Sequence, residues 1–462
     1  MSTIHTTNQL RIFVSLIISM LLVFSLATPH TAHAATLVVD TLLDENDGSC
    51  SDGDCSLRDA IQVAAPGDTI TFSVTGTIVL TLGQLNVDKD LSISGPGQEN
   101  LTVSGNNSSR VFYVTGGNTA FSGLTIANGF ADEGGGMYND STSTTTLTRV
   151  SFSNNSAYSI SQDGHGGGMY NAGTSTLMDV IFSNNSATNS SSGGGMYNDG
   201  TSTLTNIIFS DNSAEATGGG MVNYWISNLS NVIFNDNSGS IGGGLWNIGD
   251  SRFTNLTLTK VSFSGNLASD GGGMFNESGR FKLMNVTFSG NSATYGGGGL
   301  FNNYGAAYLT NVTISGNSTN GVGGGVDVPY YPEDPSILIL KNTLLAGNTA
   351  PTGPDCSGTL ISYGYNLIQD TTDCTITGDE TGNIYGVGPL LGPLADNGGF
   401  TLTHALLPGS LAIDTADFTD SYGNPVTEDQ RGVSRPQGSA NDIGAFEVGY
   451  PAYWLWLPFV FR

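Results

Sequence analysis

The stretch GGGMYNDGTSTLTNIIFSDNSAEATGGGMVN, residues 193–223, contains one complete unit of the repeat that decides the fold. Blocks similar to its IIFSDNSA start at residues 150, 180, 207, 232, 261, 286, 312 and 343. Triple glycines accompany these blocks at residues 134, 166, 193, 218, 242, 271, 297 and 323. Two series that keep step at intervals of 24–32 residues indicate a repeat architecture.

Each unit has the spacing of short strands that turn at corners. In the unit of Leu177, Val180 and Phe182, the last two residues lie on one face of a strand, and the extra residue after Leu177 implies a bend. Apolar segments of about 4–6 residues between Gly and Asn leave no room for helices. The sequence therefore predicts an all-β fold, a right-handed parallel β-helix whose coils stack at about 4.8 Å.

Stacked coils place equivalent residues in columns. An interior column is expected to comprise Phe152, Phe182, Phe209, Phe234, Phe263 and Phe288, followed by Ile314 and Leu345. A hydrogen-bonded amide ladder at a corner is expected from Asn155, Asn185, Asn212, Asn237, Asn266, Asn291, Asn317 and Asn348. Because Asn348 is the last of these repeats, it should contribute less stability than an interior member. The triple glycines mark corners where the backbone takes positive φ or packs closely.

A further column follows the glycines. Its Met and Leu residues at 137, 169, 196, 221, 245, 274 and 300 are uniformly aliphatic, as an interior stack requires, so the residues after them should face outward. These are Tyr138, Tyr170, Tyr197, Trp246, Phe275 and Phe301, interrupted by Val222. A row of exposed rings would form a platform for sugar rings, which makes these the candidate binding residues. The alternatives are that a loop covers the rings or that they stack on one another.

The paired blocks of residues 134–350 resemble the repeats of chlamydial polymorphic outer-membrane proteins and of right-handed parallel β-helix proteins in general. This resemblance implies a surface protein, often an adhesin, with no shared set of catalytic residues. Residues 73–350 are therefore expected to form the β-helix coils, and residues 73–130 to form its less regular part.

Residues 1–34 have the pattern of an export signal. Arg11 precedes the apolar run of residues 12–26, and Ala32-His33-Ala34 is typical of a cleavage site. A signal peptide predicts an extracellular or cell-surface location.

The four cysteines form two local pairs, Cys50 with Cys55 and Cys356 with Cys374, which indicates disulfides in an oxidising compartment. Zinc is disfavoured because neither pair is a C-x2-C.

Residues 35–72 resemble the CSLREA-type segment of secreted bacterial β-helix proteins through the run Cys55-Ser56-Leu57-Arg58-Asp59-Ala60, with Asp59 where the motif has Glu. Ser56 is a good N-cap, and the apolar stripe after it predicts a short helix that caps the coils. The preceding loop is acidic and is a candidate for weak calcium binding, with solvated surface as the alternative. Its carboxylates are Asp44, Glu45, Asp47, Asp52 and Asp54.

Residues 351–448 break the repeat and resemble the choice-of-anchor region of secreted β-helix proteins, through DQRG at 429–432 and DIGAFE at 442–447 among other segments. The name implies that such regions precede surface-attachment tails. The hydrophobic aromatic tail at 449–462 is too short to span a bilayer as a helix. It is expected either to attach the protein to a membrane or cell wall or to pack on the domain as a last strand.

The net charge of −26 argues against nucleic-acid binding. Catalytic constellations are weak: Gly164-His165-Gly166 lacks the acidic pair of a polygalacturonase-like hydrolase, and His165 is expected simply to precede a glycine corner. Few basic residues occur on the coils, namely Arg149, Lys260, Arg280, Lys282 and Lys341. Arg149 is expected to pair with Asp179 one coil away. The sequence favours an adhesin-like structural or binding protein that contacts glycans or cell-surface components, without a cofactor other than calcium. The alternative is a carbohydrate-active enzyme, a polysaccharide lyase or polygalacturonase-like hydrolase, on the same scaffold.

Overall fold

The computed structural model describes residues 34–51, 53–159, 164–249, 254–332 and 336–449. One compact unit, which begins at Thr36, contains all the helices and strands given below. The expected export signal, apart from Ala34, and residues 450–462 of the expected tail lie outside the described residues. None of the described residues belongs to a helix with the length and hydropathy of a membrane span.

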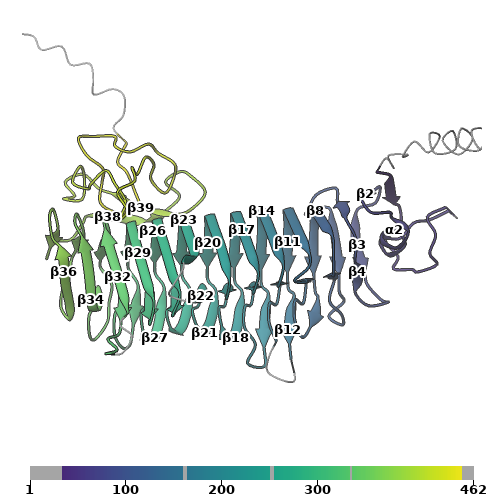
Figure 1. Ribbon diagram of the computed structural model, residues 1–462, viewed down its shortest axis with the longest axis horizontal. Coiled ribbons are helices and arrows are strands. Elements are labelled where there is room, and N and C mark those ends of the chain that lie inside the picture. Colours follow the sequence, from purple (N-terminus) through teal and green to yellow (C-terminus); the bar gives the residue numbers. More distant parts are fainter. Residues whose placement is uncertain (1–33, 52, 160–163, 250–253, 333–335, 450–462) are drawn as a thin grey trace, which may run out of the picture. The chain divides into compact units, whose positions relative to one another are not determined.

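Parallel strands of three kinds form the repeated coils, and the fold is the predicted all-β parallel solenoid, with about 11 turns (Figure 1). Short strands follow the glycine corners: β10 (Met137–Asn139), β13 (Met169–Asn171), β16 (Met196–Asn198), β19 (Met221–Asn223), β22 (Leu245–Ile248), β25 (Met274–Glu277), β28 (Leu300–Asn303) and β31 (Val326–Val328). Long strands come next: β8 (Asn118–Ala127), β11 (Thr144–Ser153), β14 (Thr174–Ser183), β17 (Thr201–Ser210), β20 (Ile226–Asn235), β23 (Thr254–Ser264), β26 (Arg280–Ser289) and β29 (Ala306–Ser315). A separate eight-stranded sheet completes each coil: β9 (Phe130–Ala131), β12 (Ser156–Tyr158), β15 (Ser186–Thr188), β18 (Ser213–Thr217), β21 (Ser238–Ile241), β24 (Leu267–Asp270), β27 (Ser292–Gly296) and β30 (Ser318–Thr319).

The repeat sets the register of neighbouring coils. Phe182 of β14 pairs with Phe209 of β17, and the six phenylalanines of the predicted interior column stack with ring centroids 4.6–4.9 Å apart. All six are fully buried, as are Ile314 and Leu345, which continue the column. Burial of one such side chain contributes about 1.5–3 kcal/mol, so this column is a large part of the core.

The predicted bend lies inside each long strand. The residue two positions after the buried Leu takes a left-handed backbone, and we call this series the bend column. Its members are Gly123, Arg149, Asp179, Asn206, Asn231, Lys260, Asn285, Asn311 and Asn342. Glycine, Asn and Asp tolerate this conformation better than other residues, which accounts for most of the column.

The glycine corners combine a positive φ with close packing of the backbone, the two properties that the sequence suggested. Gly193 has φ +71°, whereas Gly195 lies so close to the next coil that a Cβ would stand 2.5 Å from the carbonyl oxygen of Gly220. A side chain at the third glycine would therefore force neighbouring coils apart.

Two amide ladders run through the coils. The predicted ladder from Asn155 to Asn348 is present: Asn237 Nδ2 donates to Asn266 Oδ1 at 2.9 Å and to Phe209 O at 2.9 Å. At its end, Asn348 Nδ2 donates to Asp355 Oδ1 at 2.8 Å, so a residue from outside the repeat supplies the second partner that the sequence analysis did not foresee. A second, equally buried ladder was not predicted and comprises Asn139, Asn171, Asn198, Asn223, Asn247, Asn276 and Asn302.

The N-terminal coils carry the predicted cap. They comprise β1 (Thr36–Val39), α2 (Leu57–Val63), β2 (Asp68–Phe72), β3 (Gly76–Val79), β4 (Leu85–Val87), β5 (Leu91–Ser94), β6 (Leu101–Ser104) and β7 (Phe112–Val114). Ser56 Oγ accepts from Asp59 N at 3.1 Å as an N-cap, and the Cys50–Cys55 disulfide precedes the helix. Arg58 forms an ion pair with Asp44 at 2.8 Å and donates to the carbonyl oxygens of Gly83 and Gln84. These contacts hold the helix on the first coils.

Parallel pairing continues beyond residue 350, where the repeats were expected to end. β32 (Ile337–Lys341) and β33 (Leu344–Ala346) belong to the last predicted repeat. The strands beyond it are β34 (Cys356–Tyr363), β35 (Leu367–Ile368), β36 (Cys374–Asp379) and β37 (Ile384–Tyr385). The Cys356–Cys374 disulfide joins β34 to β36 in these last coils. The glycine and asparagine blocks are absent there, so the sequence pattern ended before the fold did.

Residues 386–449, the C-terminal region, contain one antiparallel pair, β38 (Leu391–Ala395) and β39 (Thr403–Leu406), and otherwise loops. The region packs on the outer face of the long strands near β23, β26 and β29 (Figure 1). Its DQRG and DIGAFE segments make the attachment: Gln430 accepts from Thr287 Oγ1 at 2.7 Å, and Ala445 N donates to Thr313 Oγ1 at 3.0 Å. Buried Asp429 accepts from both Arg431 and the amide of Glu447, which ties the two segments together.

Candidate functional site

The aromatic column lies opposite the interior Met and Leu residues, as alternation predicted, but most of it is covered. Tyr170, Tyr197 and Phe275 are only 8%, 9% and 6% exposed, and Tyr138, Trp246 and Phe301 are half-buried. The rings cover one another: Tyr138 and Tyr170 are stacked nearly parallel with centroids 4.9 Å apart, and the centroids of Phe275 and Phe301 are 4.8 Å apart. Because the coil spacing suits ring stacking, the faces that a sugar would need are occupied. The expected platform of free ring faces is therefore not formed.

Charged groups flank the N-terminal end of this column. Arg110 lies over the rings of Tyr113 and Tyr138 at 4.9 and 5.3 Å, and donates to the carbonyl oxygen of Glu133 at 2.7 Å. His165 precedes the glycine corner, as expected, and its ring stacks on Tyr197 at 4.2 Å. Burial raises the pKa of Tyr138 to about 12 and also raises the pKa of the Glu133 carboxyl. These side chains are engaged with the column, which gives them a structural role.

The acidic loop brings only some of its carboxylates near one another: burial and the neighbouring charges of Asp54 and Asp47 raise the pKa of the Glu45 carboxyl. Asp44 is turned to Arg58 and to the amides of Thr81 and Leu82. Asp47 accepts from the amide of Ser49, within its own turn. Asp52 lies outside the described residues, and among the described ones no three His, Cys, Asp or Glu side chains are placed to hold a metal ion. Calcium binding at this loop stays a prediction, and Asp44 is removed from its ligand set because its carboxylate is already paired.

Most basic residues of the coils attach the C-terminal region. Lys260 Nζ pairs with Glu428 at 2.6 Å, and Lys341 Nζ pairs with Asp417 at 2.7 Å. Lys282 Nζ lies 4.1 Å above the ring of Tyr422. These lysines therefore join the coils to the C-terminal region. The repeat pattern in the sequence does not predict these contacts.

Arg149 makes no such contact. The expected ion pair with Asp179 is not formed, because Asp179 instead accepts from Asn206 Nδ2 at 2.9 Å along the bend column. Within the described residues, Arg149 has no hydrogen bond or ion pair, and its side chain is exposed.

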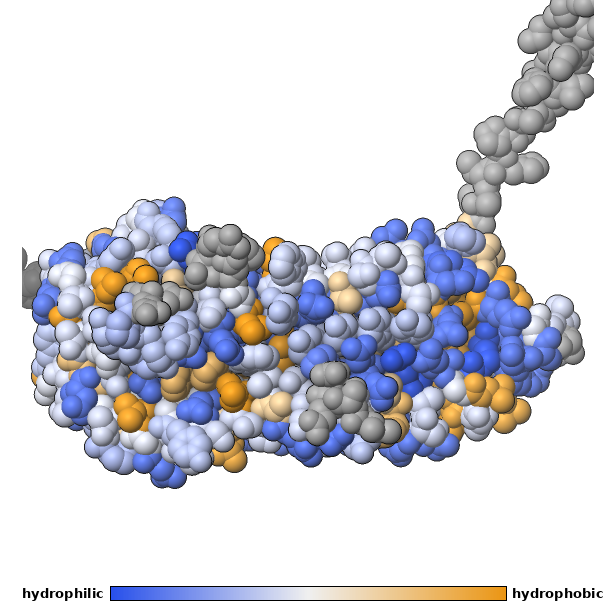
Figure 2. Space-filling model, turned by 60° about the horizontal axis from the view of Figure 1, so that its bottom comes forward, coloured by the Kyte–Doolittle hydropathy of each residue, from blue (hydrophilic) through white to orange (hydrophobic). Residues whose placement is uncertain are grey.

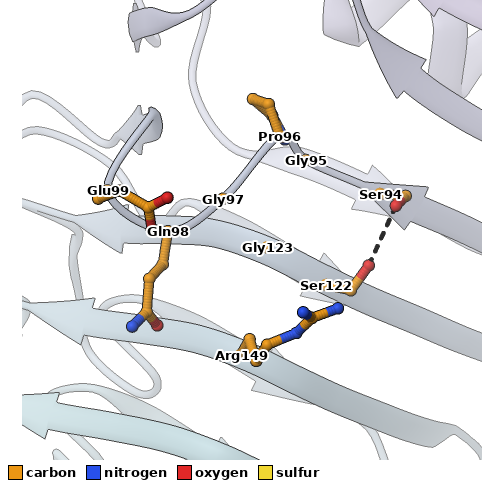
Figure 3. Close-up of a pocket in the computed structure, with 9 residues that line it drawn as sticks. All are labelled: Ser94, Gly95, Pro96, Gly97, Gln98, Glu99, Ser122, Gly123 and Arg149. Atoms are coloured by element: carbon orange, nitrogen blue, oxygen red, sulfur yellow. Dashed lines mark hydrogen bonds between the residues drawn. The ribbon is translucent and has the colours of Figure 1, made fainter.

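A notch of about 270 Å³ lies beside Arg149 (Figure 3). Arg149 extends toward Ser122 and Ser94, and Ser122 Oγ donates to Ser94 Oγ at 3.2 Å. Gln98 and Glu99 lie at the other end of the notch, beyond Gly97. We call this site the Arg149 notch; its remaining lining residues are Gly95, Pro96 and Gly123.

A second hollow, the junction cleft, lies where the C-terminal region meets the long strands, and its volume is about 460 Å³. Tyr422 lies across Lys282 and Tyr308, with ring centroids of the two tyrosines 5.4 Å apart, and remains 51% exposed. The other residues that line the cleft carry hydroxyl, amide, carboxyl or apolar side chains: Thr257, Leu283, Met284, Thr310, Asp420 and Asn424. Asp420 Oδ1 accepts from the amides of Tyr422 and Asn424 at 2.8 Å, which fixes the loop that presents the ring.

On the face that carries β12, β18, β21 and β27, exposed apolar side chains include Tyr158 and Tyr295. Figure 2 brings this side forward, and the apolar patches on it are small and separated by hydrophilic side chains. The two hollows beside the long strands are therefore the stronger candidates for a ligand site.

The fold and these sites define a parallel β-solenoid protein built from Gly- and Asn-rich repeats. Residues 285–303 match the family model of the Chlamydia polymorphic membrane protein repeat. This match covers 19 residues, part of one repeat unit, so it identifies the kind of repeat and not the family of the whole chain. No curated protein sequence matches the chain.

Two solved structures are similar in fold. The pectate lyase Pel9A matches with a TM-score of 0.49 and 13% identity, over 90% of this chain and 97% of that chain. The PL6 family alginate lyase AlyGC matches with a TM-score of 0.41 and 14% identity, over 88% of this chain and 60% of that chain. Likenesses at these scores and identities carry no argument about the activity of this chain.

Proposed function

We propose that the protein is a secreted or cell-surface binding protein of adhesin-like type that contacts glycans through the junction cleft. The single observation that carries this proposal is the half-exposed ring of Tyr422, held over a cleft lined by hydroxyl and amide groups. An aromatic ring contributes a large apolar contact with a polar end, and nearby hydrogen-bonding groups add specificity. The cleft also lies between two parts of the chain, where ligand sites are common.

Two further observations support an oxidising location outside the cytoplasm. Both cysteine pairs form disulfides, which persist in such compartments. The matched repeat carries the description of a membrane protein repeat. Attachment of the protein through residues 449–462 is part of this proposal and rests on the apolar composition of that segment.

The test is binding of the full exported chain to an oligosaccharide array, followed by titration calorimetry with the best ligand. Tyr422→Ala should weaken binding by about tenfold, since one aromatic contact is worth about 0.5–1.5 kcal/mol beyond its area. Tyr295→Ala is the matched control, because Tyr295 is 66% exposed on β27 and outside the cleft. Equal binding by wild type and Tyr422→Ala would contradict the proposal.

A carbohydrate-active enzyme is the second candidate, and the exposed, unpaired guanidinium of Arg149 is the observation that favours it. A lyase needs a positive group beside the sugar carboxylate and a base for the adjacent proton. Incubation with acidic polysaccharides, with release of reducing ends measured over time, separates the candidates. Turnover that Arg149→Ala abolishes would favour the enzyme, and binding without turnover would favour the adhesin-like module.

A further inference from the structure

The bend column contains two long cationic side chains, Arg149 and Lys260, of which only Lys260 has a partner within the described residues. Arg149 has φ +52° and Lys260 has φ +58°, in a column otherwise made of Gly, Asp and Asn. A long side chain in the left-handed region is strained, and such strain persists where a site requires the residue. Lys260 has an evident reason for its place, because it forms the ion pair with Glu428 that attaches the C-terminal region.

Arg149 has no counterpart of Glu428 within the described part of the chain. Its coil lies about 19 Å along the solenoid from that of Lys260, which is four coil steps of about 4.8 Å, and no described residue of the C-terminal region pairs with it. The guanidinium instead faces the Arg149 notch. A group from outside the chain is therefore the natural partner for this charge.

The chemistry of the notch selects the ligand. The guanidinium fits a carboxylate with two parallel hydrogen bonds. Ser94 accepts from Ser122, so its own hydroxyl proton remains for a ligand oxygen. At the other end, Gln98 and Glu99 offer amide and carboxylate oxygens that accept from hydroxyl groups, and Glu99 would repel a compact multiply charged anion such as sulfate or phosphate.

We infer that the Arg149 notch binds one acidic sugar unit, with its carboxylate at Arg149 and its hydroxyl groups toward Gln98 and Glu99. This site is separate from the junction cleft, and its test does not depend on binding there. The net charge of −26 does not prevent such binding, because exposed charges more than about 8 Å away are largely screened at physiological ionic strength.

The experiment titrates the full exported chain with a uronic acid trimer, the corresponding neutral trimer and sodium sulfate. The wild type should bind the acidic trimer at least tenfold more tightly than the neutral one. Arg149→Asn should remove that preference while melting at the same or a higher temperature, because Asn is the residue that most other coils have at this position. Arg149→Lys should retain part of the preference, since an ammonium keeps the charge without the paired geometry.

Lys260→Asn is the matched control, a cation removed from the same column. It should leave the preference for the acidic trimer unchanged. The inference is overturned if the wild type binds both trimers equally or neither, if Arg149→Asn binds like the wild type, or if sulfate competes as well as the trimer. Tyr422→Ala should bind the acidic trimer as the wild type does, because the junction cleft lies at least about 19 Å along the solenoid from the Arg149 notch.

Discussion

At the residue scale, the buried amides decide stability more than any surface contact does. Each interior asparagine bonds the coil on either side, and its neighbours cannot reach water. All asparagines of the two ladders are buried, so we expect them to contribute to stability and not to ligand contact.

Asn237→Ala and Asn348→Ala are therefore expected to destabilise the protein equally. Each change leaves buried groups unpaired, which costs at least about 1–3 kcal/mol. The two losses in stability should be equal because Asn348, although it is the last repeat member, has a second partner in Asp355. Denaturant melts measure both losses, with exposed Asn320→Ala as a control that should change stability by less than about 0.5 kcal/mol. A clearly smaller loss at Asn348 would mean that Asp355 does not complete the ladder.

Asp327, the residue that closes the aromatic column, should make stability depend on pH. Burial raises the pKa of its carboxyl to about 6, against a hydrogen bond from Ser357 that lowers it. A raised folded-state pKa means that the folded chain binds the proton more tightly, so this stability is present at low pH and is lost as pH rises toward 6.

Asp327→Asn should therefore raise stability at pH 7.5 by about 1–3 kcal/mol and change little at pH 4. Thermal melts of both proteins at the two pH values give the difference, in which other titrating groups cancel. A variant that is less stable at pH 7.5 would show that the carboxylate is favourably solvated instead.

At the scale of elements, the triple-glycine corner and the bend inside the long strand place the three kinds of strand. Turns of the coil differ in the side chains that they tolerate. At the triple-glycine corner the close approach of neighbouring coils excludes a side chain, whereas at other turns only the backbone angle restricts the residue. Gly290 illustrates the second case: it has φ +66°, and no atom lies within 4 Å of where a Cβ would stand. Asn154 and Asn184 take the equivalent place in other coils.

Gly195→Ala is expected to destabilise the protein by about 1–3 kcal/mol or more, since its Cβ would meet the backbone of the next coil. Gly290→Asn should change stability by less than about 0.5 kcal/mol, because Asn suits the same backbone angle. Urea melts of the two variants compare them directly. Similar losses at both glycines would mean that backbone angle, and not coil spacing, limits the corner.

At the scale of the whole molecule, scarce positive charges join the coils to the C-terminal region. Lys341 is largely buried and bonds Asp417, Thr419 and the carbonyl oxygen of Asp420. The junction cleft exists only because this attachment holds the loop of Tyr422 over the sheet.

Lys341→Ala should expose residues 386–449 to proteolysis while the coils stay intact, at a cost of about 1–3 kcal/mol for the partners left unpaired. Limited proteolysis followed by mass spectrometry locates the cleavage, and glycan binding at the junction cleft should fall in parallel. Arg149→Ala serves as the comparison, since that side chain has no partner in the described chain. Unchanged protection of the C-terminal region would show that its other contacts suffice.

The sequence by itself determined the solenoid, its interior phenylalanine column, one amide ladder and the helical cap. It did so because every coil of a periodic fold needs the same residue types at the same positions. Residues equivalent to Phe182 and Asn185 therefore recur in coil after coil, more often than chance would give. The same logic failed at the ends: the last coils lack the pattern, and the position of Asp355 beyond the repeat was invisible.

Only the tertiary structure decided which outward residues are free. Alternation places Tyr170 and Tyr197 outside, but it cannot tell that rings one coil apart cover one another's faces. Likewise, the lysines at 260, 282 and 341 look alike in sequence to Arg149, and contacts with a region more than 70 residues away separate them from it. Exposure depends on what packs across the chain, and no local pattern in the sequence encodes that.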